Sequence, residues 1–188
     1  MITQHLPQII GLFWGVSELC LALAKRSRSN ATSKDGHSLV TIWLVYLFVI
    51  PLAIFAAYHL PGCRLPWPEF VAGLGVGLFV LGSILRFYSI IHLGRFFTVN
   101  VAIAADHRLV VTGPYRFARH PSYSGAMLAA FGFALSFQNW ASVLIIFIPC
   151  CAVMGWRMHI EEKVLLDAFG EEYRNYMRRT KRLMPLIY

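Results

Sequence analysis

Two short stretches of this sequence carry the side chains best suited to chemistry. In RHPSY, residues 119–123, His120 and Tyr123 stand three apart on either side of the Pro121–Ser122 pair. Further on, Arg157 and Glu161 stand four apart, so a helix would place them on one face. Together they offer an imidazole, a phenol, a guanidinium and a carboxylate, groups that hold charged or polar ligands.

Each stretch also has a purely structural interpretation. His120 and Tyr123 could be a snorkelling histidine and an aromatic belt residue at a membrane surface. Arg157 and Glu161 could be a solvated ion pair, which contributes little to stability. Both pairs stand near the ends of apolar segments, where ionisable groups are costly and tend to face a cavity or a site.

Other signatures of chemistry are missing from the sequence. It contains no GxSxG, HExxH, GxxxxGK[ST] or GxGxxG motif, and no nucleophile–base arrangement stands out. The stretch GLGVGLFVLG, residues 73–82, lies inside an apolar segment, which favours close helix packing over phosphate binding. The four cysteines show no ligand-like spacing, so the sequence predicts no metal site.

Composition identifies the solvent in which the chain folds. Of its 188 residues, 57% are hydrophobic and only 14% are charged, whereas a soluble domain is about a quarter charged. This balance predicts an integral membrane protein. The net charge of +8 then indicates contact with anionic membrane lipids rather than with nucleic acid.

The apolar residues gather in five segments that are expected to be helices, because hydrocarbon leaves no solvent for unpaired backbone groups. The predicted fold is therefore an all-α membrane protein with about five transmembrane helices. The fourth segment is short and forms a helical hairpin with the fifth across a tight link. The five segments are residues 6–24, 39–60, 70–93, 122–137 and 140–158.

Basic residues predict how the chain crosses the membrane. They are frequent in residues 25–37, 94–120 and the tail after 158, whereas residues 61–69 contain only Arg64. By the positive-inside rule the N-terminus lies outside and the C-terminus in the cytoplasm. The polar regions 94–120 and 157–188 are therefore expected on the same face. The membrane is the cell membrane, or the endoplasmic reticulum if the source is eukaryotic.

Local signals refine the two polar regions. A turn at residues 112–114 precedes a short interfacial helix over 114–119, and His120 is biased away from helix because a proline follows it. Pro121 can open the fourth membrane helix. The fifth helix is expected to continue to a stop at Gly170, followed by a basic amphipathic surface helix over 171–182. Glu18, inside the first helix, is expected to pair with Arg86.

Several of these features together resemble a known family. Asn100, HRLV at 107–110, Tyr115, RHPSY at 119–123, and Arg157 with Glu161 before FGEEY are similar to the isoprenylcysteine carboxyl methyltransferases. These are integral membrane enzymes that use S-adenosylmethionine. The resemblance extends from residue 97 to the C-terminus. It suggests one domain, 1–188, with three membrane helices in 1–93 and the cofactor-binding loop, hairpin and tail in 94–188.

The resemblance also implies roles for individual residues. Arg157 corresponds to the arginine beside the substrate carboxylate, which makes it the candidate catalytic and substrate-binding residue. Asn100 stands where the family has a cofactor-contacting glutamine. The implied contacts to S-adenosylmethionine are Asn100, His107, Arg108, Leu109, Val110, Tyr115, His120, Pro121, Ser122, Tyr123 and Glu161.

The function expected from this resemblance is methyl transfer to a lipid-modified acceptor, most simply the C-terminal carboxylate of a prenylated cysteine. Such a carboxylate is ionised at neutral pH, which agrees with the lack of an evident general base. Three alternatives stay open: a phospholipid N-methyltransferase, an NADPH-dependent membrane reductase of the sterol type, and a non-catalytic protein whose basic tail binds anionic lipid. The sequence does not predict the oligomeric state.

Overall fold

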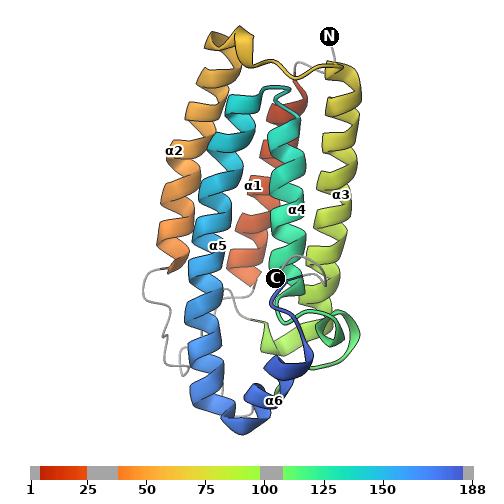
Figure 1. Cartoon of the computed structure of the whole chain (residues 1–188), viewed down its shortest axis with the longest axis vertical. Helices are drawn as coiled ribbons and strands as arrows, with labels where there is room; N and C mark the ends of the chain where they lie inside the picture. Colours follow the sequence, from red (N-terminus) through yellow and green to blue (C-terminus); the bar gives the residue numbers. More distant parts are fainter. Residues whose placement is uncertain (1–4, 25–37, 98–107, 184–188) are drawn as a thin grey trace.

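The computed structural model describes residues 5–24, 38–97 and 108–183. The chain runs up and down through long antiparallel helices, and a short helix closes one end of the bundle (Figure 1). We refer to that end as the α6 end. Across these residues the backbone forms helices and two isolated bridges but no strand, which confirms the all-α prediction. The α-helices are α1 (Leu6–Ala24), α2 (Ser38–His59), α3 (Pro68–Leu93), α4 (Pro121–Leu135), α5 (Trp140–Phe169) and α6 (Glu171–Arg179).

Four helices are long and apolar enough to cross a membrane: α1, α2, α3 and α5. Helix α4 has 15 residues and so rises about 22 Å, less than the hydrocarbon thickness of about 30 Å. It lies beside α1, α3 and α5 (Figure 1). Most of its side chains are buried. The expected integral membrane protein is thus confirmed, with the fourth segment as a buried core helix.

Close packing of α3 on α4 depends on glycine. A Cβ added at Gly82 would lie 2.4 Å from the backbone nitrogen of Ala129, and one at Gly132 would lie 2.4 Å from that of Phe79. Contacts this short leave no room for any side chain, so the two backbones touch directly. The glycine-rich stretch in α3 therefore packs helices, as its sequence predicts. The contact involves Gly75 and Gly82 of α3 and Gly125 and Gly132 of α4.

At the end opposite α6, a polar turn sets the register of α5. Asn139 caps this helix by accepting a hydrogen bond from the Ser142 backbone N–H at 3.2 Å, and its amide donates to the Leu60 carbonyl at 3.0 Å. The Ser142 hydroxyl donates to the Ala53 carbonyl of α2 at 2.7 Å. Since α4 and α5 are joined by this short turn, the cap fixes which residues of α5 face α4 at the other end.

At the α6 end, the segment before α4 lies beside the residues that follow α6. We refer to α6 and these residues, 171–183, as the tail. Ala118 and Lys181 form a parallel bridge, and the Arg119 N–H donates to the Lys181 carbonyl at 2.8 Å. The His120 N–H donates to the Arg182 carbonyl at 3.0 Å. The prediction that the two polar regions share one end of the bundle is therefore confirmed (Figure 1).

Two local predictions need correction at this end. The expected interfacial helix over 114–119 is a single 3-10 turn, η4 (Gly113–Arg116), because the residues after it pair with the tail. The expected surface helix over 171–182 ends at Arg179, where Thr180 turns extended to make that pairing. It is also not a free surface helix, since Tyr173 and Tyr176 are buried. Its start after Gly170, with φ +50°, is as predicted.

The glycine contact makes a direct stability prediction. We expect Gly132→Ala to lower the free energy of unfolding by about 1–3 kcal/mol, because the new methyl group forces α3 and α4 apart. Gly77→Ala is the matched control: its Cβ meets nothing within 4 Å, so it should be neutral or stabilising. Thermal unfolding of both variants in detergent measures the difference, and equal melting temperatures would contradict the packing role.

Candidate active site

A single continuous cavity connects the membrane-spanning helices with the α6 end. Its lining differs along its length. Towards the middle of the bundle the walls are mostly apolar side chains of α1, α2, α4 and α5, such as Trp14, Ile50, Phe133 and Ile146. At the α6 end the walls are polar and include His120, Tyr123, Arg157 and Glu161. The cavity can therefore hold an apolar chain and a polar group together.

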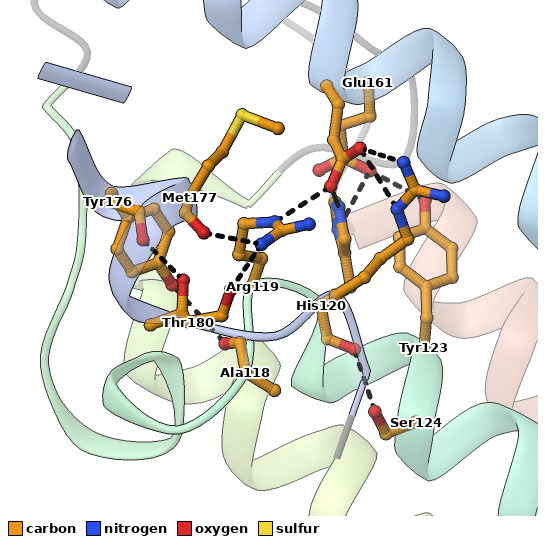
Figure 2. A network of polar contacts seen from close by, with 11 residues as sticks. Ala118, Arg119, His120, Tyr123, Ser124, Glu161, Tyr176, Met177 and Thr180 are labelled. Atoms are coloured by element: carbon orange, nitrogen blue, oxygen red, sulfur yellow. Dashed lines mark hydrogen bonds and ion pairs between the residues drawn. The ribbon is translucent and has the colours of Figure 1, made fainter. Parts of the chain in front are cut away.

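Tyr123 links the two predicted pairs. Its hydroxyl donates to Glu161 Oε2 at 2.9 Å and accepts from Arg157 Nε at 2.8 Å. The His120 ring packs edge-on against the Tyr123 ring, with His120 Nδ1 4.0 Å from Glu161 Oε2 (Figure 2). The entrance of α4 and the extension of α5 therefore meet in one polar cluster, formed by His120, Tyr123, Arg157 and Glu161.

The exposure of these groups differs in a useful way. Arg157 is 5% exposed and His120 is 4% exposed, so both are held by the surrounding protein. The Glu161 side chain retains 31% of its surface, and it lines the cavity. Because Glu161 is partly open, it can bind a cationic ligand and keep its hydrogen bond from Tyr123. His120 itself is non-helical, with φ −124° and ψ 59°, as its position before Pro121 predicts.

A neighbouring carboxylate, Glu162, was not predicted from the sequence. It is 4% exposed, and its Oε1 accepts from Arg119 Nε at 3.0 Å and contacts His120 Nε2 at 3.3 Å. Its Oε2 accepts from Arg182 at 2.6 Å. The signal available was the adjacent Glu161–Glu162 pair, whose members must point to different faces of a helix. Glu161 lines the cavity, whereas Glu162 pairs with arginine side chains of the protein.

Arg119 extends this network to the tail. Besides Glu162, its guanidinium donates to the carbonyls of Met177 and Thr180 at the end of α6 (Figure 2). Tyr176 adds a second attachment by donating to the Tyr115 carbonyl at 2.6 Å. Burial raises the pKa of Tyr176 to about 12, so this hydroxyl stays a donor at neutral pH. The tail is therefore fixed against the segment that carries His120.

Most residues named by the resemblance lie in the cavity wall. Tyr115 is buried, donates to the Ser89 carbonyl at 3.3 Å, and has its pKa raised by burial well above the ordinary value. Pro121 starts α4 and is not among the lining residues. Asn100 and His107 lie outside the described residues. The lining includes Arg108, Leu109, Val110, Tyr115, His120, Ser122, Tyr123, Arg157 and Glu161.

The predicted pairing of Glu18 with Arg86 is also confirmed. Arg86 Nε donates to Glu18 Oε1 and the terminal Nη2 donates to Oε2, both at 2.7 Å. Both side chains line the same cavity. Within the described residues no group of three or more histidine, cysteine or acidic side chains could hold a metal ion.

Comparisons with known proteins agree with this geometry. Residues 70–172, more than half of the chain, match the phospholipid methyltransferase family. Protein-S-isoprenylcysteine O-methyltransferase B of Arabidopsis thaliana is 29% identical over 193 residues, which cover 99% of this chain and 93% of that protein. The protein-S-isoprenylcysteine O-methyltransferase of Saccharomyces cerevisiae is 34% identical over 116 residues, covering 61% of this chain and 48% of that protein.

A solved structure is similar over much of the fold. The structure of the eukaryotic intramembrane Ras methyltransferase ICMT, an isoprenylcysteine carboxyl methyltransferase, has a TM-score of 0.66 and 25% identity. The match covers 78% of this chain, which spans about half the length of that protein, 53%. The chain belongs to the phospholipid methyltransferase family of enzymes. Its predicted resemblance to the isoprenylcysteine carboxyl methyltransferases is confirmed.

Glu162 generates a stability prediction that separates it from Glu161. We expect Glu162→Gln to destabilise the protein by about 3–5 kcal/mol, because it leaves Arg119 and Arg182 without their shared counter-charge. Glu172→Gln, at an exposed position on α6, is the matched control and should change little. Thermal unfolding and limited proteolysis of the tail report the difference; a tail equally resistant in both variants would argue against the network.

Proposed function

We propose that this protein transfers a methyl group from S-adenosylmethionine to the C-terminal carboxylate of a prenylated cysteine. The observation that carries the proposal is one cavity that has an apolar part between membrane helices and a polar part at the α6 end. A lipid-modified acid needs both parts at once. The relatives named as isoprenylcysteine O-methyltransferases, one of which aligns with nearly the whole chain, support this acceptor.

The polar part of the cavity fits the cofactor by its chemistry. S-adenosylmethionine carries an ammonium and hydroxyl groups, which match a partly open carboxylate at Glu161 with His120 and Tyr123 beside it. When bound, it supplies a methyl group on a cationic sulfur. The segment Arg108–Val110 and the ring of Tyr115 line the same part of the cavity and would cover the cofactor. Contacts from Asn100, His107, Pro121 and Ser122 follow from the family resemblance.

Arg157 is placed to orient the acceptor. Its Nε donates to Tyr123, so the guanidinium is held in position before any ligand arrives. A guanidinium can bind a carboxylate through two parallel hydrogen bonds, and this pairing also sets the direction from which the carboxylate approaches. Orientation of this kind can lower the activation free energy by several kcal/mol. Because the acceptor is already an anion, no general base is required of the site.

Exclusion of water favours this reaction. A cationic donor and an anionic acceptor lose charge as they approach the transition state. Water stabilises the separate charges of the reactants, so a weakly hydrated site favours the reaction. Here α6, held through Arg119 and Tyr176, contributes Tyr173 and Tyr176 to the cavity wall. The apolar helices enclose the other part.

We further propose that the α6 end faces the cytoplasm and that the N-terminus lies outside. The support is the concentration of arginine and lysine at this end, which the positive-inside rule associates with the cytoplasmic side. In this orientation the water-soluble cofactor enters from the cytoplasm. The lipid-modified acceptor reaches the same cavity from the bilayer.

The family match also supports a second acceptor class, the amine of a phospholipid such as phosphatidylethanolamine. That amine must lose a proton before it can accept a methyl group, and Arg157 is a poor base. Labelled S-adenosylmethionine offered with a farnesylated cysteine or with phosphatidylethanolamine distinguishes the two. We expect label in the farnesylated cysteine alone.

Cofactor choice is tested by thermal stabilisation. We expect saturating S-adenosylhomocysteine to raise the melting temperature, corresponding to about 2.7 kcal/mol at a concentration of 100 times Kd. NADPH should have no effect. Glu161→Ala and His120→Ala should weaken the stabilisation, because each removes a polar contact with the cofactor. A protein stabilised by NADPH instead would be a reductase.

The role of Arg157 predicts a specific kinetic change. We expect Arg157→Lys to lower kcat/KM for the acceptor by about 100-fold, because a lysine cannot orient a carboxylate through two hydrogen bonds. The affinity for S-adenosylhomocysteine should change little. Arg174→Lys, at an exposed position on α6, is the control. A variant that loses cofactor affinity and retains kcat would assign Arg157 to the cofactor.

A further inference from the structure

The ion pair between Glu18 of α1 and Arg86 of α3 lines the cavity. It lies outside the polar cluster of His120, Tyr123, Arg157 and Glu161. The two side chains retain 19% and 12% of their surface, so the pair forms part of the cavity wall. A largely buried ion pair is a weak stabiliser, because desolvation offsets most of the attraction. Ionisable side chains within membrane helices commonly face a cavity and mark the pathway of a substrate or ion.

Helix packing places Arg86 close to the polar cluster. The backbone nitrogen of Arg86 lies only 2.5 Å from where a Cβ on Gly125 would be, so α3 touches α4 at this residue. Tyr123, two residues earlier on α4, holds Arg157. Arg86 and Arg157 are thus two cationic side chains along one cavity, and Arg86 is paired with Glu18.

We infer that Glu18 is a stand-in for the acceptor's carboxylate on Arg86, and that Arg86 receives an acidic acceptor by exchange with Glu18 before it reaches Arg157. The inference rests on the proposed function. Glu18 and the acceptor present the same chemical group, so the guanidinium can bind either through the same two nitrogens. Arg86 is then paired with a carboxylate both with and without the acceptor, and the displaced Glu18 carboxylate faces the cavity that it lines.

The attachment of α1 makes this exchange feasible. Ile10 is the only residue of α1 buried in the described structure, and the other residues of this helix are exposed or partly buried. Trp14 and Phe13 contact the Phe79 ring, one turn before Glu18. Glu18 is itself only partly buried, so its side chain can withdraw without exposing the buried residue of α1.

The exchange also discriminates substrate from product. The acid competes with Glu18 for Arg86 because it is an anion. The methyl ester formed from it is neutral and cannot compete, so Glu18 returns to Arg86 and the ester is released. Glu18 is therefore a residue that sets specificity and lies outside the reacting groups.

The experiment compares an acid with its own methyl ester in the Glu18→Gln variant. The probes are N-acetyl-S-farnesylcysteine and its methyl ester, and their Kd values are measured on the purified full chain. Removing the internal competitor should tighten binding of the acid about tenfold, the effect of one charge-assisted contact, and leave the ester unchanged. Glu69→Gln, an exposed carboxylate at the opposite end of α3, should leave both values unchanged.

Two further variants keep the test decisive. Glu18→Asp withdraws the carboxylate by one methylene, so it should shift the acid-to-ester ratio in the same direction by a smaller factor. Adding Arg86→Gln to Glu18→Gln should abolish the gain for the acid. An acid-to-ester ratio that stays at the wild-type value in all Glu18 variants overturns the inference and leaves the ion pair as a tether. If the wild type methylates no farnesylated acid, the proposed function itself fails.

Discussion

The α6 end of this protein depends on one buried carboxylate. Glu162 is shared by Arg119 and His120 from the segment before α4 and by Arg182 from the tail. These residues come from segments that are distant in the sequence and that also pair through their backbones. Because a buried carboxylate is stable only when its charge is balanced, Glu162 holds these parts together. The tail can then cover the cavity.

The site uses the geometry that this network creates. His120 contacts Glu162 through one ring nitrogen and lies near Glu161 through the other. Tyr123 connects Glu161 with Arg157, so each side chain of the polar cluster is positioned by another. Such mutual support preorganises the groups that are proposed to orient cofactor and acceptor. The helices beneath contribute the apolar part of the cavity, with α3 and α4 in backbone contact.

Much of the architecture could be predicted because membranes leave few choices. Apolar segments must be helices, and the ends of α1, α2, α3 and α5 fall close to the predicted positions. Gly170 and Pro121 mark helix boundaries through their own backbone preferences. The short helix over 114–119 and the surface helix over 171–182 were predicted less well, since pairing between residues distant in sequence overrode local patterns.

The sequence by itself determined the membrane helices, the pairing of Glu18 with Arg86, and the residue types available for methyl transfer. Spacing along a helix was enough to place Arg157 and Glu161 together. Only the tertiary structure decided that Glu161 opens to the cavity whereas Glu162 is buried among cations, because their surroundings come from α4 and the tail. A single helix specifies which faces its residues occupy, and the packing around it specifies what each face meets.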